Sequence, residues 1–404
     1  MSERASGLIL TLNSGSSSLK AALYSIGDGE SLVLRGQIER IGLKGDNRGA
    51  LVDAAGKNLE THDTYFPDHA AALDALFSWL RRHGSAEIRA VGHRIVHGGP
   101  RYVSPQLVTA ELLAELRRLA PFDPMHLPAE IQGVEAVARL SPALPQVACF
   151  DTAFHRTLPD VARTLALPRS FADQGIRRYG FHGLSYEYIL EELARVAGPT
   201  AATGRIVIAH LGNGASMAAV RDGQCIDTTM GFTPTGGLVM GTRTGDLDPG
   251  VLLYLLREQR LTTDQLNDLV NHQSGLLGLS GSSSDMRQLL EQAPSNPAAA
   301  LAVAIFCYQA RKFVGALTAA LGGLDTLIFT AGIGEKAAPI RRDICAGLEW
   351  LGVQIDAARN DAAAAVISTD TSRVCVRVLR TDEELMIARH THRILTEQAS
   401  ATPR

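Results

Sequence analysis

Apolar runs broken by short glycine-rich turns recur along the chain and predict its strands. Residues 7–12 (GLILTL) and 19–24 (LKAALY) flank the polar turn NSGSSS, so we expect two strands joined by a tight loop. The same layout recurs at 206–220, where IVIAHL and MAAV flank GNGAS, and Gly15 aligns with Gly214. Chance similarity of two hairpins is the alternative. A hairpin that opens each half of the chain predicts a duplicated fold.

Helical periodicity separates these strands. Asp68 is placed to cap a helix that ends at Gly84, and Ser185 is placed to begin one that ends before Gly198. Further helices are predicted over 298–321 and 382–396.

Strands and helices alternate, which is typical of an α/β protein. A buried strand at 325–330 is predicted to lead into a glycine turn, AGIGE. The length of 404 residues indicates two to three folding units, since domains commonly have about 100–200 residues. The predicted domains are 1–151 and 152–383, and the C-terminal helix, about 384–404, is expected to pack back on the first.

Charge and composition exclude some classes of function. A net charge of −3 gives no electrostatic footprint for nucleic acid or for an anionic membrane. The apolar segment 297–321 carries Gln309, Arg311 and Lys312, which favours a buried helix over a membrane span. The N-terminus lacks the pattern of a signal peptide, so we expect a cytoplasmic protein. The five cysteines, an odd number without C-x-x-C spacing, are expected to be reduced core thiols.

Known phosphate-binding signatures explain little of this chain. No segment fits the Walker loop, and GSSSLK lacks its second glycine. GIGEKA (332–337) formally fits a dinucleotide fingerprint, with Asp356 downstream, but it lies far from the N-terminal half where such folds begin. A nicotinamide enzyme is therefore disfavoured.

Glycine-flanked polar loops are spread through both halves, and most follow an apolar run. Ligands of open α/β sheets bind at such strand ends, where glycine lets backbone N–H groups approach phosphate. One such loop alone is more commonly structural, but a set rich in Arg, His, Asp and Glu indicates a phosphate-handling site. The loops are NSGSSSLK (13–20), GHRIVHGG (92–99), FDTAFH (150–155), RRYGFHG (177–183), HLGNGAS (210–216), MGTRTGD (240–246), FTAGIGE (329–335) and RTDEEL (380–385).

In order and spacing these loops resemble those of the acetokinase family, within the actin-like, Hsp70-like and sugar-kinase-like superfamily. The resemblance runs from Leu8 to about Ile394. It implies two duplicated ribonuclease H-like (actin-like ATPase) domains with an interdomain active-site cleft. It also implies reversible, direct in-line transfer of the ATP γ-phosphoryl group to acetate, giving acetyl phosphate and ADP. Mg²⁺, with Mn²⁺ as the alternative, and a homodimer are implied as well.

The resemblance assigns roles to matching positions. Arg94 and Arg243 match arginines that flank the phosphoryl group, which suits a transfer catalysed by positioning and positive charge. The matching catalytic residues are Arg94, Asp151, His182 and Arg243, of which His182 and Arg243 stabilise the transition state. His126 matches a further active-site histidine. Asn13 and Glu383 match the metal site, with the neighbouring Glu384 as the alternative to Glu383.

The binding residues follow in the same way. Asn13, Ser16, Ser18 and Lys20 match the first phosphate loop. The ATP-binding matches are Lys20, His210, Asn213, Gly214, Asp285, Arg287, Gly332, Ile333, Gly334 and Glu335. The acyl-pocket matches are Val96, Met125, Phe181 and Pro234, and Arg94 also contacts the substrate. As single residues, these histidines would more commonly be core residues and the arginines surface partners of nearby acids.

Three departures from the family pattern bear on specificity. Met125-His126-Leu127-Pro128 stands where Leu-His-Asn-Pro is usual, Lys336 where Asn is common, and Asp382 where Asn is common. The first changes one pocket wall and opens the choice of acid, so a propionate or butyrate kinase is the alternative enzyme. A non-catalytic actin-like ATP-binding protein is the alternative of another class.

Overall fold

The computed structural model describes residues 7–401 except 16, 28, 44–47 and 84–87. The chain forms two compact units, one of residues 1–154 with 382–404 and one of residues 155–381. These junctions differ by a few residues from those expected at 151/152 and 383/384. The first junction falls inside the 3₁₀ helix Asp151–Thr157. At the second, Asp382 accepts hydrogen bonds from Tyr24 and Arg35 of the first unit.

The first unit contains an eight-stranded sheet with the order β5-β4-β3-β2-β1-β6-β8-β7. Its strands are β1 (Gly7–Gly15), β2 (Ser18–Ile26), β3 (Glu30–Glu39), β4 (Arg48–Asp53), β5 (Asn58–His62), β6 (Ile88–Ile95), β7 (Gln106–Leu107) and β8 (Gln146–Phe150). Its helices are α1 (His69–Arg82), α2 (Ala110–Leu119), α3 (Leu127–Leu140) and α15 (Glu383–Ala401), with a 3₁₀ turn at Ala120–Phe122.

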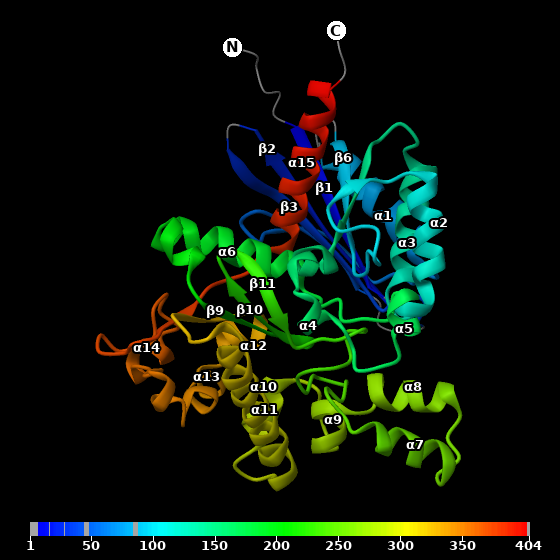
Figure 1. Ribbon diagram of the computed structural model, residues 1–404. Helices are drawn as coiled ribbons and strands as arrows, with labels where there is room; N and C mark the ends of the chain where they lie inside the picture. Colours follow the sequence, from blue (N-terminus) through cyan, green and yellow to red (C-terminus); the bar gives the residue numbers. More distant parts are fainter. Residues whose placement is uncertain (1–6, 16, 28, 44–47, 84–87, 402–404) are drawn as a thin grey trace. The chain divides into compact units, whose positions relative to one another are not determined.

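Helices cover both faces of this sheet. Leu10 and Leu12 of β1 join one core with α1 and α3, whereas Ile9 joins another with Ala388 of α15. This alternation follows from the two-residue period of a strand. In Figure 1, α15 (red) lies along the strands of this sheet (blue).

The second unit contains a five-stranded sheet with the order β11-β10-β9-β12-β13. Its strands are β9 (Ile206–Leu211), β10 (Ala215–Arg221), β11 (Gln224–Thr228), β12 (Thr326–Thr330) and β13 (Cys375–Val378). Its helices are α4 (Asp160–Arg163), α5 (Arg169–Asp173), α6 (Gly183–Ala197), α7 (Pro249–Arg257), α8 (Thr263–His272), α9 (Gly275–Ser280), α10 (Met286–Gln292), α11 (Pro297–Leu321), α12 (Ala331–Lys336), α13 (Ala338–Cys345) and α14 (Ala357–Asp361), with 3₁₀ turns at Pro199–Thr203 and Glu349–Leu351.

The two sheets repeat one strand order. In the first, β3-β2-β1 is antiparallel and β1-β6-β8 is parallel. In the second, β11-β10-β9 is antiparallel and β9-β12-β13 is parallel. Both predicted hairpins are present, as β1–β2 and β9–β10. The chain therefore has the expected duplicated α/β fold of actin-like ATPases.

Three local predictions need correction. Helix α6 begins at Gly183, not at Ser185, because the Ser185 hydroxyl bonds to other side chains and does not cap the helix. The expected glycine turn after β12 is the short helix α12. Helix α1 is capped by Asp68 as predicted but ends at Arg82, and the proposed stop, Gly84, lies outside the described residues.

Helix α11 is the one described helix that is long and apolar enough to cross a membrane, judged by length and composition alone. It packs against α9, α10 and α13 and against β10, as an apolar core helix does. Four of the five free cysteines are buried and Cys375 is half-buried, which confirms the prediction of reduced thiols.

Candidate functional site

A charged cluster lies at one edge of the first sheet. Arg94 is near the end of β6, Asp151 directly follows β8, Asn13 is near the end of β1, and Glu383 begins α15. Because β1, β6 and β8 are parallel neighbours, their carboxyl ends meet at the same edge. The sheet therefore brings together predicted site residues that are far apart in the sequence.

Arg94 is the centre of this cluster. Its Nη2 lies 2.6 Å from Asp151 Oδ2, and its Nε lies 3.1 and 3.2 Å from the two carboxylate oxygens of Asp151. Its Nη1 lies 3.4 Å from Asn13 Oδ1, and its Nε lies 3.9 Å from Glu383 Oε2. The fork of the guanidinium is thus held by a carboxylate whose side chain is only 1% exposed. Asp151 therefore interacts with the arginine of this cluster.

Burial and charge shift the titration of this cluster. Burial alone would lower the pKa of Arg94, but the carboxylates of Asp151 and Glu383 outweigh burial and raise it. Burial raises the pKa of Glu383 to about 7, against the opposing effect of Arg94 and with a further rise from Asp151. Arg94 therefore stays charged, while Glu383 needs a nearby cation to hold its negative charge.

Lys20 belongs to the same edge. It lies opposite Asn13 in the β1–β2 ladder and is exposed. Its positive charge lowers the pKa of Glu383, which indicates that the two groups are close. Ser16, the other serine expected in this loop besides Ser18, lies outside the described residues.

The predicted acyl-pocket residues of this unit lie beside the cluster in sequence. Val96 is buried, and its backbone N–H donates to both carboxylate oxygens of Glu130 in α3, at 3.2 and 3.0 Å. Met125 is half-buried. His126 precedes α3, and its Nδ1 lies 2.8 Å from Asp123 Oδ1.

The sequence prediction missed Glu130. Its carboxyl is buried, and burial raises its pKa well above the ordinary value although the Val96 N–H opposes this rise. The signal was present, because Glu130 stands on the apolar face of α3, where the pattern of burial calls for Leu or Ile.

The second unit carries a cluster of histidines around its hairpin. His182 precedes α6 in the left-handed conformation, with φ of 59°. Its Nδ1 lies 2.8 Å from Ser216 Oγ on β10. His210 on β9 stacks on it, with ring centroids 4.2 Å apart and planes 14° apart, and has its Nδ1 2.8 Å from Ser185 Oγ on α6. A serine of β10 thus holds His182, which lies next to α6, and a serine of α6 holds His210, which lies on β9.

Arg243 and Gly214 complete this cluster. Arg243 Nη1 donates to the carbonyl oxygen of Pro234 at 3.0 Å. A methyl group placed on Gly214 would lie 3.3 Å from His182 Nε2 and 3.8 Å from Arg243 Nη1. A donor and a cation therefore converge on the glycine of the hairpin loop.

Two further predicted residues of this unit make backbone contacts. The backbone carbonyl of Asn213 accepts a hydrogen bond from the Gly241 N–H, and the carbonyl of the buried Phe181 lies 3.0 Å from His155 Nε2.

The residues expected on the adenosine side form two separate groups. Gly332, Ile333, Gly334 and Glu335 lie in α12, where Glu335 Oε1 accepts from the backbone N–H groups of Ala331 and Thr381. Asp285 caps α10 through the Arg287 N–H and pairs with the exposed Arg287 side chain at 2.6 Å.

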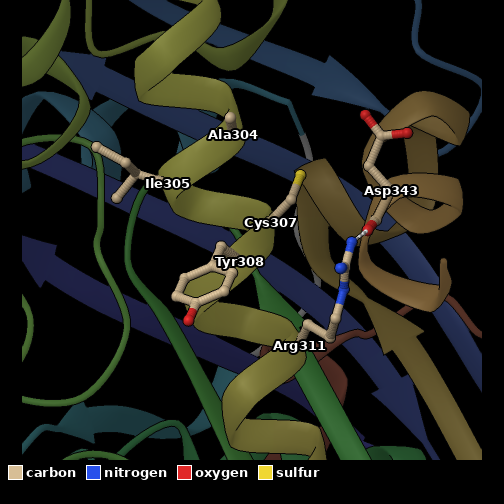
Figure 2. Close-up of a pocket in the computed structure, with 6 residues that line it drawn as sticks. All are labelled: Ala304, Ile305, Cys307, Tyr308, Arg311 and Asp343. Carbon is tan, nitrogen blue, oxygen red and sulfur yellow. Dashed lines mark hydrogen bonds between the residues drawn. The ribbon is translucent and has the colours of Figure 1, made fainter. Parts of the chain in front are cut away.

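A pocket lies among the described residues, outside these two clusters. This pocket has a volume of about 500 Å³. Residues of α11 and Asp343 of α13 line it (Figure 2). Arg311 crosses it to donate to the backbone carbonyl of Asp343. None of its lining residues was predicted as a site residue, and their chemistry differs from that of the two clusters.

Comparisons with known proteins agree with this arrangement. A model of the acetokinase family matches residues 8–389. An acetate kinase of Rhodopseudomonas palustris is 47% identical over 398 residues, covering 96% of this chain and 98% of the relative. An acetate kinase of Thermotoga maritima is 42% identical over 400 residues, covering 96% and 98%.

Solved structures give the same result. The crystal structure of Porphyromonas gingivalis acetate kinase has a TM-score of 0.88 and 39% identity, covering 96% of this chain and all of that chain. A propionate kinase from Francisella tularensis has a TM-score of 0.90 and 36% identity, covering 95% and 98%. The chain belongs to the acetokinase family.

Proposed function

We propose that this chain is an ATP:acetate phosphotransferase, which transfers the γ-phosphoryl group of ATP directly and reversibly to the carboxylate of acetate. The products are acetyl phosphate and ADP. The observation that carries the proposal is the half-buried Arg94 guanidinium, which the buried Asp151 orients by a forked ion pair at the carboxyl ends of parallel strands. The level of identity to relatives named acetate kinase supports the choice of acid.

The chemistry needs fixed positive charge more than it needs a covalent intermediate. In-line phosphoryl transfer leaves negative charge on three equatorial oxygens, and preorganised cations and N–H donors stabilise that charge. We assign this role to Arg94, Arg243 and His182. Asp151 keeps the Arg94 fork in one orientation, so that little reorganisation is needed during transfer.

Asn13 and Glu383 are our candidates to hold Mg²⁺, with Mn²⁺ as the alternative. Mg²⁺ prefers oxygen ligands and takes few from the protein, keeping water and phosphate oxygens for the rest. Among the described residues, no group of three or more His, Cys, Asp or Glu side chains is arranged to hold a metal ion. Bound Mg²⁺ would neutralise phosphate charge and favour the charged form of Glu383.

For the nucleotide we assign the phosphates to Lys20, His210, Asn213 and Gly214. The adenosine side is assigned to Asp285, Arg287 and α12, Gly332 to Glu335 included. Glu335 takes part through its backbone in this proposal, because its carboxylate already accepts two backbone N–H groups.

For the acyl group we assign Val96, Met125, Phe181 and Pro234 as the apolar wall. A propionate kinase is the second candidate, because a structure of that name has a TM-score of 0.90 with this chain. The two candidates share the phosphoryl-transfer residues and differ only in the room left for one methylene.

We also infer a cytoplasmic homodimer. Helix α7 supports the dimer, because none of its residues is buried although six of its nine, the run VLLYLL, are Val, Leu or Tyr. Leu253 is 49% exposed and Tyr254 is 56% exposed. An exposed apolar helix of this kind is typical of a surface that a partner covers. Light scattering of the purified chain measures its mass in solution, and a monomer would contradict the inference.

Trapping of the acyl phosphate with hydroxylamine tests the proposed activity. The chain is incubated with Mg-ATP and acetate, propionate or butyrate, with a reaction lacking acid as the control. We expect acyl hydroxamate with acetate at the highest kcat/KM. A higher value for propionate or butyrate would reassign the substrate, and no hydroxamate with any acid would contradict the kinase.

A further inference from the structure

The stacked histidines of the second unit lead to a hydroxyl that the proposed function leaves unused. Ser216 Oγ, which lies 2.8 Å from His182 Nδ1, also lies 2.5 Å from the phenol oxygen of Tyr186. Ser216 and Tyr186 are both fully buried. Tyr186 lies on α6 one helical turn after His182, the residue that directly precedes this helix, so α6 positions both ends of this chain of hydrogen bonds.

The chemistry of the three groups sets the direction of these hydrogen bonds. Ser216 has one hydroxyl proton and two neighbours, so it donates to one of them and accepts from the other. A phenol is more acidic than an aliphatic hydroxyl and is the better donor, so Tyr186 donates to Ser216. Ser216 then donates to His182 Nδ1. A neutral imidazole that accepts at Nδ1 carries its proton on Nε2.

The position of the His182 ring determines which group its tautomer presents to the hairpin loop. Nε2 of His182 is the atom that faces Gly214, at 3.3 Å from where a methyl group on that glycine would lie. His182 is held in a left-handed backbone conformation that is unfavourable for a residue other than glycine, and its ring is stacked on His210. The backbone and the neighbouring ring thus fix the orientation, and the hydroxyls fix the proton.

We propose that Tyr186 and Ser216 are positioning residues that hold His182 as the Nε2–H tautomer, with its N–H directed at the hairpin loop. Within the proposed function, which this inference deepens, that N–H donates to the transferring phosphoryl group. The reverse direction of the relay would present a lone pair to the phosphate oxygens, and this contact would be repulsive. Neither residue touches the reacting atoms in this proposal.

Nitrogen NMR of the full chain labelled with ¹⁵N-histidine tests the tautomer without substrate. The variant His182→Asn identifies the signals of His182 among those of the twelve histidines. We expect a protonated Nε2 and an unprotonated Nδ1 in the wild type. Tyr186→Phe, which keeps the ring and removes the donor, should give a mixture of tautomers. A protonated Nδ1 in the wild type would overturn the proposal, whichever variants fold.

Kinetics supply the second measurement. We expect Tyr186→Phe to lower kcat about tenfold, the scale of one lost buried hydrogen bond, with KM for ATP nearly unchanged. Ser216→Ala should lower kcat further. The matched control is Tyr179→Phe, which removes another buried phenol of this unit, one that donates to the Gly175 carbonyl at 2.8 Å. If Tyr186→Phe and Tyr179→Phe give the same spectrum and the same kcat, the relay is structural. Failure of the wild type to make acyl phosphate would contradict the proposed function alone, since the spectrum reads the relay independently.

Discussion

The two sheets share a strand order but differ in what stands at the ends of their parallel strands. In the first, Arg94 lies near the end of β6 and Asp151 directly follows β8, and the two form a charged pair whose side chains are 18% and 1% exposed. In the second, β12 runs into the short helix α12, and the polar side chains gather instead around the β9–β10 hairpin. The duplicated fold therefore determines the positions at which functional residues can lie. It does not determine which residues occupy those positions.

Removing Arg94 should have the largest effect, because the comparison of the two sheets assigns the Arg94–Asp151 ion pair to the first sheet alone. Arg94→Ala and Arg243→Ala are each expected to lower kcat at least about a hundredfold, the scale of one lost transition-state donor. Only Arg94→Ala should also reduce stability strongly, by about 3–5 kcal/mol, because it leaves the buried Asp151 carboxylate without its cation. Turnover and urea unfolding measure the two effects.

Arg94→Lys is the control for charge without the fork. It should recover part of the stability and little of the activity, since an ammonium group cannot make the same forked pair. Near wild-type kcat in a folded Arg94→Ala or Arg243→Ala variant would show that the arginine concerned is structural.

The variant Glu383→Gln tests whether the first unit holds the metal ion through this carboxylate. This change keeps the shape of the side chain and removes its charge, so the Mg²⁺ concentration for half-maximal rate should rise about tenfold or more. Stability should hardly change, because burial already raises the pKa of Glu383 to about 7 and the neutral form is tolerated. Glu384→Gln is the matched control. Equal Mg²⁺ dependence in both variants would count against Glu383 as a ligand.

Val96→Ala addresses the choice of acid. One methylene in an apolar pocket is worth only about 1–3 kcal/mol, so discrimination depends on lack of room. Val96 is stiff at its branched carbon, and Glu130 holds its backbone. We expect kcat/KM for propionate relative to acetate to rise about tenfold, while the flexible Met125, changed to Leu, shifts the ratio less. An unchanged ratio in Val96→Ala would remove this residue from the pocket.

The smallest effects are expected at the surface pair of α10. Asp285→Ala should lower stability by about 1 kcal/mol, because it removes the cap of that helix. Arg287→Ala should leave stability nearly unchanged, since its side chain is 83% exposed. If both contact adenosine, KM for ATP rises a few-fold in each variant. A rise in neither would separate this pair from the nucleotide site.

Periodicity in the sequence predicted much of the fold, because the relevant signals were local. Both hairpins, the cap at Asp68 and the long helix before Gly322 each depend on residues close in sequence. The errors arose where a distant partner decided the outcome. Ser185 has the side chain of a helix cap, but His210 and Thr381 bind its hydroxyl, and α6 begins earlier.

The candidate site was predictable in its residue types and less so in its supports. Glycine-flanked loops at strand ends indicated Arg94, Asp151, His182 and Gly214. Glu130, Ser216 and Tyr186 support that set through contacts across the fold. Glu130 is marked only as an acidic residue on the apolar face of α3, and nothing adjacent to Ser216 or Tyr186 in the sequence marks their contacts. The roles assigned to the site residues stay predictions until the variants are measured.

The return of α15 to the first sheet affects how the protein is made. A ribosome completes β1 and β2 before the rest of this sheet, but the helix that covers Ile9, Ala22, Tyr24 and Ile26 is made only after all of residues 155–381. Until then one apolar face of the nascent sheet has no cover, and such surfaces attract chaperones or aggregate. The second unit is continuous in sequence and does not have to wait for this helix. Synthesis order therefore favours folding the inserted unit first and closing the surrounding one only after α15 has been made.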